Sequence, residues 1–363
     1  MTYSGDSAER EGHERATRQE LGRRLAALTR FIDGGEYDPQ TRYEAPLYFL
    51  PSDTLMGDTA SGLGIRSERN LFGGVVPHPF VATKTITHNL QSEDSYAPHG
   101  WRAEFPRKVA DVVLEGFSAF GKEDAMLVGR KLLAFGPVRI KLATGVAGHG
   151  QFVADTPSAL VGALDPIDAG EIRRSGLVVE QNLSDVTTYS VGQIGVADTV
   201  VTYYGMQHLT TNNHDAEVYG GSEIFVVRGD FDALLGLRLL DNVRLAITQA
   251  RIYDRAAAEC FEGFFASRRN YDVAQGRDAA GKLRSGVLEQ SWRAGGASGA
   301  EIAAFEAFQA DPSLNSVRAM TREVYGEPPP ALPANAAIYF AGADPRVGPL
   351  TKFAWAETHA NPR

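Results

Sequence analysis

The sequence predicts an α/β protein in which a parallel strand–helix–strand unit precedes lobes that each combine a sheet with helices. The chain has 363 residues, 43% of them hydrophobic and 22% charged, so it can bury a substantial core and is not disordered. Near the N-terminus, strand and helix patterns follow one another at the short spacing of a parallel α/β unit. Farther along, the stretch 137–210 reads mostly as strand.

The first part of the chain contains few but distinct elements. A polar lead comes first, followed by a short amphipathic helix around Leu21, Leu25 and Leu28. A strand is expected over 46–50, a helix over 54–63, and a strand or loop over 73–76. A short apolar run over 80–84 ends in a lysine and is also expected to form a strand.

The middle and the end of the chain alternate helices with longer strands. Helical patterns cover 109–120 and 122–135, and an antiparallel sheet carrying one helix follows. Its strands are expected over 138–142, 151–154, 177–180, 189–196 and 200–207, and its helix over 158–164. A long helix with apolar residues at i, i+3 and i+4 includes Val243 and Ala257. Two strands flank a turn at 276–281, and another helix opens after Gly296.

These patterns divide the chain into four parts. We expect an N-terminal α/β domain over 1–115, a central lobe over 116–212, a C-terminal lobe over 213–326, and a linker with a small terminal unit over 327–363. The linker is indicated by the run Glu327–Pro330, and the terminal unit contains the apolar segment 336–340.

Composition excludes several classes of function. The 36 basic and 45 acidic residues give a net charge of −9, which argues against a protein that binds nucleic acid through the phosphate backbone. Cys260 is the only cysteine, so there is no intrachain disulfide and no cysteine-rich zinc site. No apolar run is long enough for a signal peptide or a membrane span. We therefore expect a cytoplasmic protein that binds neither nucleic acid nor membrane.

One segment combines a lysine with a glycine-rich loop. Lys141 lies on a predicted strand, the loop over 144–150 contains Gly145, Gly148, His149 and Gly150, and a second strand returns. Glycines let backbone amides approach an anion closely, and the lysine adds a fixed positive charge. The loop does not have the Lys-Ser/Thr ending of a P-loop and leads into a strand. A phosphate cradle and an ordinary glycine-rich hairpin are both consistent with this pattern.

A second segment combines acidic and polar residues on two neighbouring strands. Antiparallel pairing would place Asp272 beside Glu289, while Ser291 and Arg293 would point to the same face as Glu289 because side chains alternate along a strand. Mg²⁺ prefers one or two carboxylates together with substrate phosphates. A solvated acidic face is the alternative, although the apolar neighbours of Glu289 indicate a buried acid that needs a partner.

Taken in order, these residues resemble the ATP-grasp superfamily. Its members commonly carry a lysine on a first strand, a second lysine before a glycine-rich loop, an apolar strand that ends in glutamate, and a late Asp … Glu-x-Asn-x-Arg metal motif. The corresponding residues are Lys84, Lys141, the loop 144–150, Glu180 after Leu177-Val-Val, Asp272, and the segment Glu289-Gln-Ser291-Trp-Arg293. The resemblance spans roughly residues 80–300 and includes the order of sheets and helices between the motifs.

The resemblance implies a role for each residue. Lys84, Lys141 and the loop residues Gly145, Gly148, His149 and Gly150 would contact the phosphates of ATP. Glu180 would meet the adenine amino group, and the hinge from Gln181 to Leu183 would complete adenine recognition. Asp272, Glu289 and Ser291 would hold Mg²⁺, with Ser291 in place of the usual Asn, and Arg293 and Lys141 would act in catalysis. The acidic ribose contact found in many relatives has no clear counterpart here.

The whole chain also resembles a bacterial family of unknown function. The resembling stretches are Gly73–His78, Ala82–His88, Val218–Ser222 and Ser267–Asp272. That resemblance implies no reaction.

The leading functional hypothesis is an ATP- and Mg²⁺-dependent ligase that converts a carboxylate to an acyl phosphate for attack by an amine or thiol. The alternatives are a non-catalytic ATP-binding sensor or scaffold, favoured by Ser291, and a kinase-like transfer to a hydroxyl. The expected partners are small molecules, and assembly into a homodimer stays open.

Overall fold

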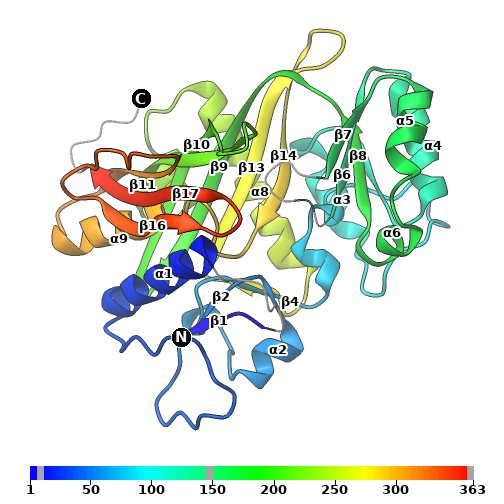
Figure 1. The fold of residues 1–363 in the computed structure, drawn as a ribbon. Coiled ribbons are helices and arrows are strands. Elements are labelled where there is room, and N and C mark those ends of the chain that lie inside the picture. Colours follow the sequence, from blue (N-terminus) through cyan, green and yellow to red (C-terminus); the bar gives the residue numbers. More distant parts are fainter. Residues whose placement is uncertain (6–11, 144, 146–149, 358–363) are drawn as a thin grey trace.

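The computed structural model describes residues 1–5, 12–143, 145 and 150–357, and it contains three regions (Figure 1). An N-terminal unit of short strands lies below a large antiparallel sheet, and a smaller sheet with its own helices lies beside them. The structure thus confirms the α/β class, with an N-terminal parallel unit and two sheet-plus-helix regions.

The N-terminal unit is parallel, as expected. Strand β1 (Thr2–Tyr3) pairs in parallel with β2 (Leu50–Pro51), and β3 (Leu55–Met56) pairs in parallel with β4 (Gly74–Val76). A late strand, β12 (Phe265–Ala266), joins β4 in antiparallel orientation. The helices of this unit are α1 (His13–Thr29) and α2 (Gly57–Gly62). Because β4 lies beside a strand that is distant in sequence, this unit is tied directly to the C-terminal half.

Two local predictions in this half of the chain are wrong. The run 80–84 forms two 3₁₀ turns, η2 (Pro79–Ala82) and η3 (Lys84–Ile86), because Pro79 starts the first turn and Thr83 caps the second by accepting from the Thr85 amide. The expected helix over 109–120 is instead α3 (Glu104–Val109), η4 (Ala110–Val112) and the strand β5 (Gly116–Ala119). Pairing of β5 with a distant strand overrides the helical pattern of its sequence.

The smaller sheet has four strands in the order β5-β8-β6-β7, all antiparallel. Its other strands are β6 (Val138–Leu142), β7 (Gln151–Ala154) and β8 (Leu177–Gln181), and its helices are α4 (Lys122–Leu133), α5 (Pro157–Leu164) and α6 (Ala169–Ser175). Val138 and Ile140 of β6 pack in the core of this sheet. Alternation along the strand therefore turns Lys141 toward the opposite face.

The larger sheet has eight strands in the order β14-β13-β9-β10-β11-β15-β17-β16. They are β9 (Ser184–Val196), β10 (Thr199–Thr211), β11 (Glu217–Arg228), β13 (Arg268–Arg277), β14 (Leu283–Ser291), β15 (Ser316–Tyr325), β16 (Ala337–Asp344) and β17 (Gly348–Glu357). The helices that accompany them are α7 (Phe231–Leu235), α8 (Asp241–Cys260) and α9 (Ser298–Ala310).

The larger sheet includes segments that were predicted from the sequence to belong to other parts of the molecule. Strands β9 and β10, expected in the central lobe over 116–212, pair with β13 and β11 of the larger sheet. The segment 327–363 was expected as a separate small unit, but β17 pairs with β15 along its length and extends the same sheet. Val218–Ser222, one of the stretches that resemble the family of unknown function, lies within β11. The larger sheet is thus a single continuous surface.

The two faces of the larger sheet carry different cores. Helix α8 covers one face, where its Ile247 and Tyr253 belong to the same buried cluster as Tyr271 and Val273 of β13. Helix α9 covers part of the other face and packs in a cluster that includes Tyr203. Within the described residues, no helix is both long and apolar enough to cross a membrane.

Candidate functional site

Lys84 connects the N-terminal unit to two other parts of the molecule. Its side chain is only 4% exposed, and its Nζ lies 2.7 Å from Oε2 of Glu289 on β14. The same Nζ donates to the backbone carbonyl of Gly145 at 2.9 Å. Three elements that the sequence proposed for one site, namely the first lysine, the glycine-rich loop and the acidic strand, therefore meet at one ammonium group.

The backbone around Lys84 is held in place by the neighbour of Glu289. The buried amide of Gln290 donates to the carbonyls of Val81 at 3.0 Å and Thr83 at 2.8 Å, and its Oε1 accepts from the Tyr253 hydroxyl. Side chains alternate along β14, so Glu289 binds the ammonium group of Lys84 while Gln290, on the opposite face, holds the turn that carries Lys84.

Gln290→Leu is therefore expected to lower the free energy of unfolding by about 2–4 kcal/mol, because three buried hydrogen bonds are lost and two carbonyls are left without a donor. Urea unfolding would measure this change. Gln309→Leu, at an exposed position on α9, is the matched control and should change stability by less than about 0.5 kcal/mol. Equal effects of the two substitutions would contradict the anchoring role.

Lys141 forms a buried ion pair. Its Nζ lies 2.5 Å from Oε1 of Glu180 on the adjacent strand β8, and the two side chains are 3% and 1% exposed. His88 contacts the other carboxylate oxygen of Glu180, with Nε2 at 3.4 Å. The second lysine and the glutamate expected at adenine thus lie together on one face of the smaller sheet, backed by a histidine from the N-terminal unit.

The charges around Glu180 keep it ionised. Burial alone would raise the pKa of Glu180, but the attraction of Lys141 and the hydrogen bond from His88 outweigh it and lower the pKa to about 2. Gly116, opposite Glu180 on β5, leaves the room that His88 occupies, because a Cβ at 116 would lie 2.9 Å from Nε2 of His88. Position 116 therefore requires glycine.

The residues after Glu180 are held in a fixed, extended path. The Gln181 amide donates to the Glu115 carbonyl at 2.8 Å, and the Asn182 amide donates to the Pro137 carbonyl at 3.0 Å. The Asn182 side chain accepts from Arg139 at 2.9 Å, and Leu183 follows in a buried position. This hinge runs directly from the smaller sheet into β9 of the larger sheet.

Asp272 and Glu289 are directly opposite each other on β13 and β14, as the sequence predicted. Burial and then the negative charge of Glu289 raise the pKa of Asp272 to about 7, while Arg268 and Lys141 act in the opposite direction. The Asp272 carboxylate also accepts weak hydrogen bonds from Gln207 at 3.4 and 3.5 Å. Glu289 has a lysine partner, but among the described residues no cation is paired with Asp272, so negative charge is incompletely balanced there.

Ser291 and Arg293 stand at the end of β14, and both are contacted by Arg268. The guanidinium of Arg268 donates to the carbonyls of Ser291 at 3.2 Å and Arg293 at 2.6 Å, and to the Ser291 hydroxyl at 3.4 Å. The side chain of Arg293 lies 3.6 Å from Asp53, just after β2. In the described structure, no contact joins the Arg293 side chain to Lys84 or Lys141, so Arg293 lies apart from the lysines.

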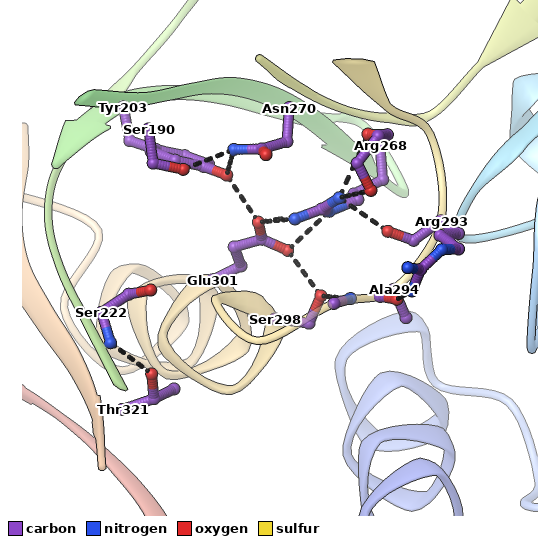
Figure 2. A network of polar contacts seen from close by, with 12 residues as sticks. Ser190, Tyr203, Ser222, Arg268, Asn270, Arg293, Ala294, Ser298, Glu301 and Thr321 are labelled. Carbon is purple, nitrogen blue, oxygen red and sulfur yellow. Dashed lines mark hydrogen bonds and ion pairs between the residues drawn. The ribbon is translucent and has the colours of Figure 1, made fainter. Parts of the chain in front are cut away.

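A buried polar network supports this strand end (Figure 2). Arg268, 2% exposed, pairs with the fully buried Glu301 of α9 at 2.7 Å. Glu301 also accepts from the Tyr203 hydroxyl at 2.7 Å and from Ser298 at 3.0 Å. Asn270 donates its amide to Tyr203 and Ser190. The network thus fixes the face of the sheet on which Asp272 and Glu289 lie.

Several residues that contact the candidate site were not predicted from the sequence. His88, Gln290, and the Arg268–Glu301 pair stand in no recognised motif, and only spatial pairing reveals them. His88 does end the segment Ala82–His88 that resembles the family of unknown function. Of the predicted loop residues, Gly148 and His149 lie outside the described part of the chain, and Gly150 supplies a carbonyl to the Leu142 amide at 2.9 Å.

The donors at this site suit a hard cation held jointly with a ligand. Among the described residues, no group of three or more His, Cys, Asp and Glu side chains could hold a metal ion on its own. The paired carboxylates of Asp272 and Glu289 are hard oxygen donors of the kind that Mg²⁺ uses together with phosphate oxygens. Asp272 lies opposite Glu289, and a positive charge between the two carboxylates would offset their mutual repulsion. The residues present therefore fit a magnesium–phosphate ligand.

Comparison with known proteins gives a family and a fold. The model of a family described as "Protein of unknown function (DUF3182)" matches residues 2–354. No curated protein matches the sequence.

Two solved structures resemble the chain along nearly its whole length. Phosphoribosylamine–glycine ligase from Thermotoga maritima is 15% identical with a TM-score of 0.52, and the match covers 98% of this chain and 92% of that one. Biotin carboxylase from Campylobacter jejuni, solved as a complex with β,γ-ATP, is 12% identical with a TM-score of 0.55 over 98% and 87% of the two chains. Both are ATP-grasp enzymes. The chain therefore has the ATP-grasp fold.

Proposed function

This chain belongs to the DUF3182 family, and we propose that it is an ATP- and Mg²⁺-dependent ligase that activates a carboxylate for attack by an amine or thiol. The observation that supports this proposal most strongly is the meeting of two buried lysines with two paired carboxylates. Lys84 binds Glu289, Lys141 binds Glu180, and Asp272 lies opposite Glu289 within the influence of the Lys141 charge. The ATP-grasp fold is consistent with it.

The nucleotide would lie between the two sheets. Lys141 and Lys84 would turn from their present carboxylate partners to phosphate oxygens, and Gly145, already bonded to Lys84, would bring the loop over them. Glu180 would accept from the adenine amino group, and the hinge from Gln181 to Leu183 would line the base. Because both lysines are already held by carboxylates, nucleotide binding would exchange one set of ion pairs for another.

The metal would be held by Asp272 and Glu289. Mg²⁺ held there would supply positive charge that stabilises the phosphoryl group during its transfer. The protein's part is to hold the two carboxylates in register and to keep Lys84 and Lys141 near the transferring group, and Arg293 would have to turn from Asp53 to join them.

The proposed reaction has two steps. An oxygen of the substrate carboxylate attacks the γ-phosphorus, the bond to the β,γ-bridging oxygen breaks, and ADP leaves, so that an acyl phosphate forms. The amine or thiol then attacks the acyl carbon and inorganic phosphate departs. Exclusion of water by loop closure would protect the acyl phosphate from hydrolysis.

ADP release in the presence of Mg²⁺ tests this proposal. We expect release to depend on both a carboxylate and an amine or thiol from a panel of small metabolites, and to be slow when either is omitted. ADP release that responds to hydroxyl compounds instead would support kinase-like transfer.

A second candidate is an ATP-binding sensor or scaffold without turnover. It is favoured by the contact of the Ser291 hydroxyl with the Arg268 guanidinium, which occupies a group expected at the metal. Tight MgATP binding measured by calorimetry, with no ADP released under any combination of substrates, would support this candidate over the ligase.

A further inference from the structure

Four residues lie close together at the proposed metal site, two on β13 and two on β14. Asp272 is paired in register with Glu289, and Asn270, two residues earlier on β13, is paired in register with Ser291. Residues two apart on one strand share a face and stand roughly 6.6 Å apart, and residues directly opposite have Cβ atoms about 4.5–5.5 Å apart. Asn270 and Ser291 are therefore the two candidates for a third oxygen ligand beside the two carboxylates.

We propose that Asn270, and not Ser291, supplies the third protein oxygen to the divalent cation held by Asp272 and Glu289. This inference rests on the proposed function, because it assigns a ligand within the same MgATP site. Two observations support this assignment. Hydrogen bonds fix the direction of the Asn270 amide, and the Ser291 hydroxyl already contacts Arg268.

A chain of hydrogen bonds fixes the Asn270 amide. The Tyr203 hydroxyl donates its only proton to Glu301 at 2.7 Å, so it can only accept from Asn270, whose Nδ2 lies 2.9 Å away. The nitrogen of Asn270 therefore faces Tyr203, and its oxygen is turned to the other side. Figure 2 shows this orientation.

The Asn270 nitrogen has a second acceptor, the Ser190 hydroxyl at 2.6 Å. With both amide protons used, rotation of the amide by 180° would break two hydrogen bonds. Asn270 is only 7% exposed, and within the described residues no donor is hydrogen-bonded to its Oδ1. With its two amide protons directed to Tyr203 and Ser190, Asn270 presents an oxygen that is free to accept, and a hard cation is a suitable partner for such an oxygen.

Ser291 is a poorer candidate because its hydroxyl is already engaged. Nη1 of Arg268 lies 3.4 Å from the Ser291 Oγ and 3.2 Å from the Ser291 carbonyl. A hydroxyl oxygen directed at a guanidinium faces a positive charge, which opposes a second cation at the same atom. Asn270 has no such contact, so the amide oxygen on β13 takes the place available beside Asp272.

The test compares Asn270→Ser, Ser291→Ala and the exchanged double variant Asn270→Ser with Ser291→Asn. Binding of Mn²⁺ in the presence of the β,γ-imido analogue of ATP is followed by the electron paramagnetic resonance signal of free Mn²⁺. We expect Asn270→Ser to weaken Mn²⁺ binding by about tenfold or more, since loss even of an outer-shell partner costs about 10–100-fold. Ser291→Ala should leave it unchanged, and the double variant should regain most of the loss.

Two controls separate a lost ligand from a disturbed fold. Affinity for the same analogue in EDTA should be close to wild type in all three variants. The thermal unfolding midpoint should fall to a similar extent in the two variants that carry Asn270→Ser, because both lose the hydrogen bonds to Ser190 and Tyr203, so that Mn²⁺ binding is the measurement that separates them. Loss of Mn²⁺ binding in Ser291→Ala but not in Asn270→Ser would overturn the assignment and leave the proposed function standing. A wild-type protein whose nucleotide binding is independent of Mn²⁺ would overturn the proposed metal site and this assignment together.

Discussion

Asp272→Asn is expected to abolish Mg²⁺-dependent ATP turnover and, at the same time, to make the metal-free protein more stable at neutral pH. Turnover should fall below detection because one of the two carboxylate ligands is lost. Stability should rise because Asp272 is partly buried and lies beside the negative charge of Glu289, and these two effects raise its pKa to about 7. A neutral amide of the same shape removes that repulsion.

The gain in stability should depend on pH with a defined sign. The Asp272 pKa is about 7 in the folded protein and 3.8 in the ordinary case, so between these values the folded state holds a proton that the unfolded state has released. Wild-type stability therefore falls as pH rises from about 4 to about 7 on account of this group. The advantage of Asp272→Asn should be absent below pH 4 and reach about 1–3 kcal/mol above pH 7, as measured by urea unfolding at several pH values.

Glu289→Gln is the matched comparison, and the structure predicts a different effect on stability. It should abolish turnover equally, but Lys84 is 4% exposed and would lose its carboxylate partner. Breaking a buried pair leaves an uncompensated charge, so this substitution should destabilise the metal-free protein. The simpler expectation, that loss of either acid relieves repulsion, does not hold for Glu289. Equal stabilisation by both substitutions would show that Lys84 and Glu289 do not pair in solution.

The pairing of Asp272 with Glu289 was predictable in part, because both residues belong to one hairpin and strand pairing within a hairpin is local. A β-bulge between Asp272 and Val273 shifts the register and brings Asp272 opposite Glu289, and this shift was not predicted. The strand of Lys141 and the strand ending in Glu180 were marked by clear alternation and apolar runs.

The ion-pair partners were not predictable, because they depend on contacts between segments that are distant in sequence. Lys84 and Glu289 lie more than 200 positions apart, and Arg268 reaches Glu301 on a helix after the strand has ended. The lysine-bearing segment was taken for a strand because its residues are apolar, whereas Pro79 and the Thr83 cap favour 3₁₀ turns. Local composition there predicted a strand where the structure has 3₁₀ turns, although Lys84 still lies beside Glu289 in the candidate site.

The assignment of β9 and β10 failed for a related reason. Their sequence predicts two strands joined by a tight turn, and the structure has this hairpin. The local pattern of either strand does not indicate the sheet to which it belongs. Sheet membership is decided by the pairing of β9 with β13, some 80 positions later. Strand existence could therefore be predicted from local pattern, and strand order could not.

Lys141→Ala is expected to weaken MgATP binding by roughly ten- to a hundredfold, since a charge-assisted phosphate contact contributes about 1.5–3 kcal/mol. The structure adds a second consequence. Lys141 neutralises Glu180, which is 1% exposed, so its removal leaves a buried carboxylate with only His88 beside it. Breaking such a pair costs about 3–5 kcal/mol of stability. Weaker binding in this single variant would therefore have two causes, the loss of the contact between Lys141 and phosphate and the destabilisation caused by the unpaired Glu180 carboxylate.

The double variant Lys141→Met with Glu180→Gln separates the two effects. Removing both charges together leaves no buried ion, so stability should return toward wild type while ATP affinity stays low. Its acid response should change as well. The lowered pKa of Glu180, about 2, stabilises the wild type above pH 4.5, and that contribution is lost as pH falls from 4.5 toward 2. The double variant should lose less stability over this range.

Calorimetric titration with MgATP and urea unfolding at pH 3 and pH 7 provide the two readouts. If Lys141 binds phosphate, affinity stays low in the double variant even where its stability equals that of the wild type. If Lys141 serves only to neutralise Glu180, affinity returns together with stability, because the double variant removes the buried charge that the single variant exposes. Wild-type ATP affinity in the stable double variant would thus remove Lys141 from the nucleotide site and leave the Lys141–Glu180 pair a purely structural element of the smaller sheet.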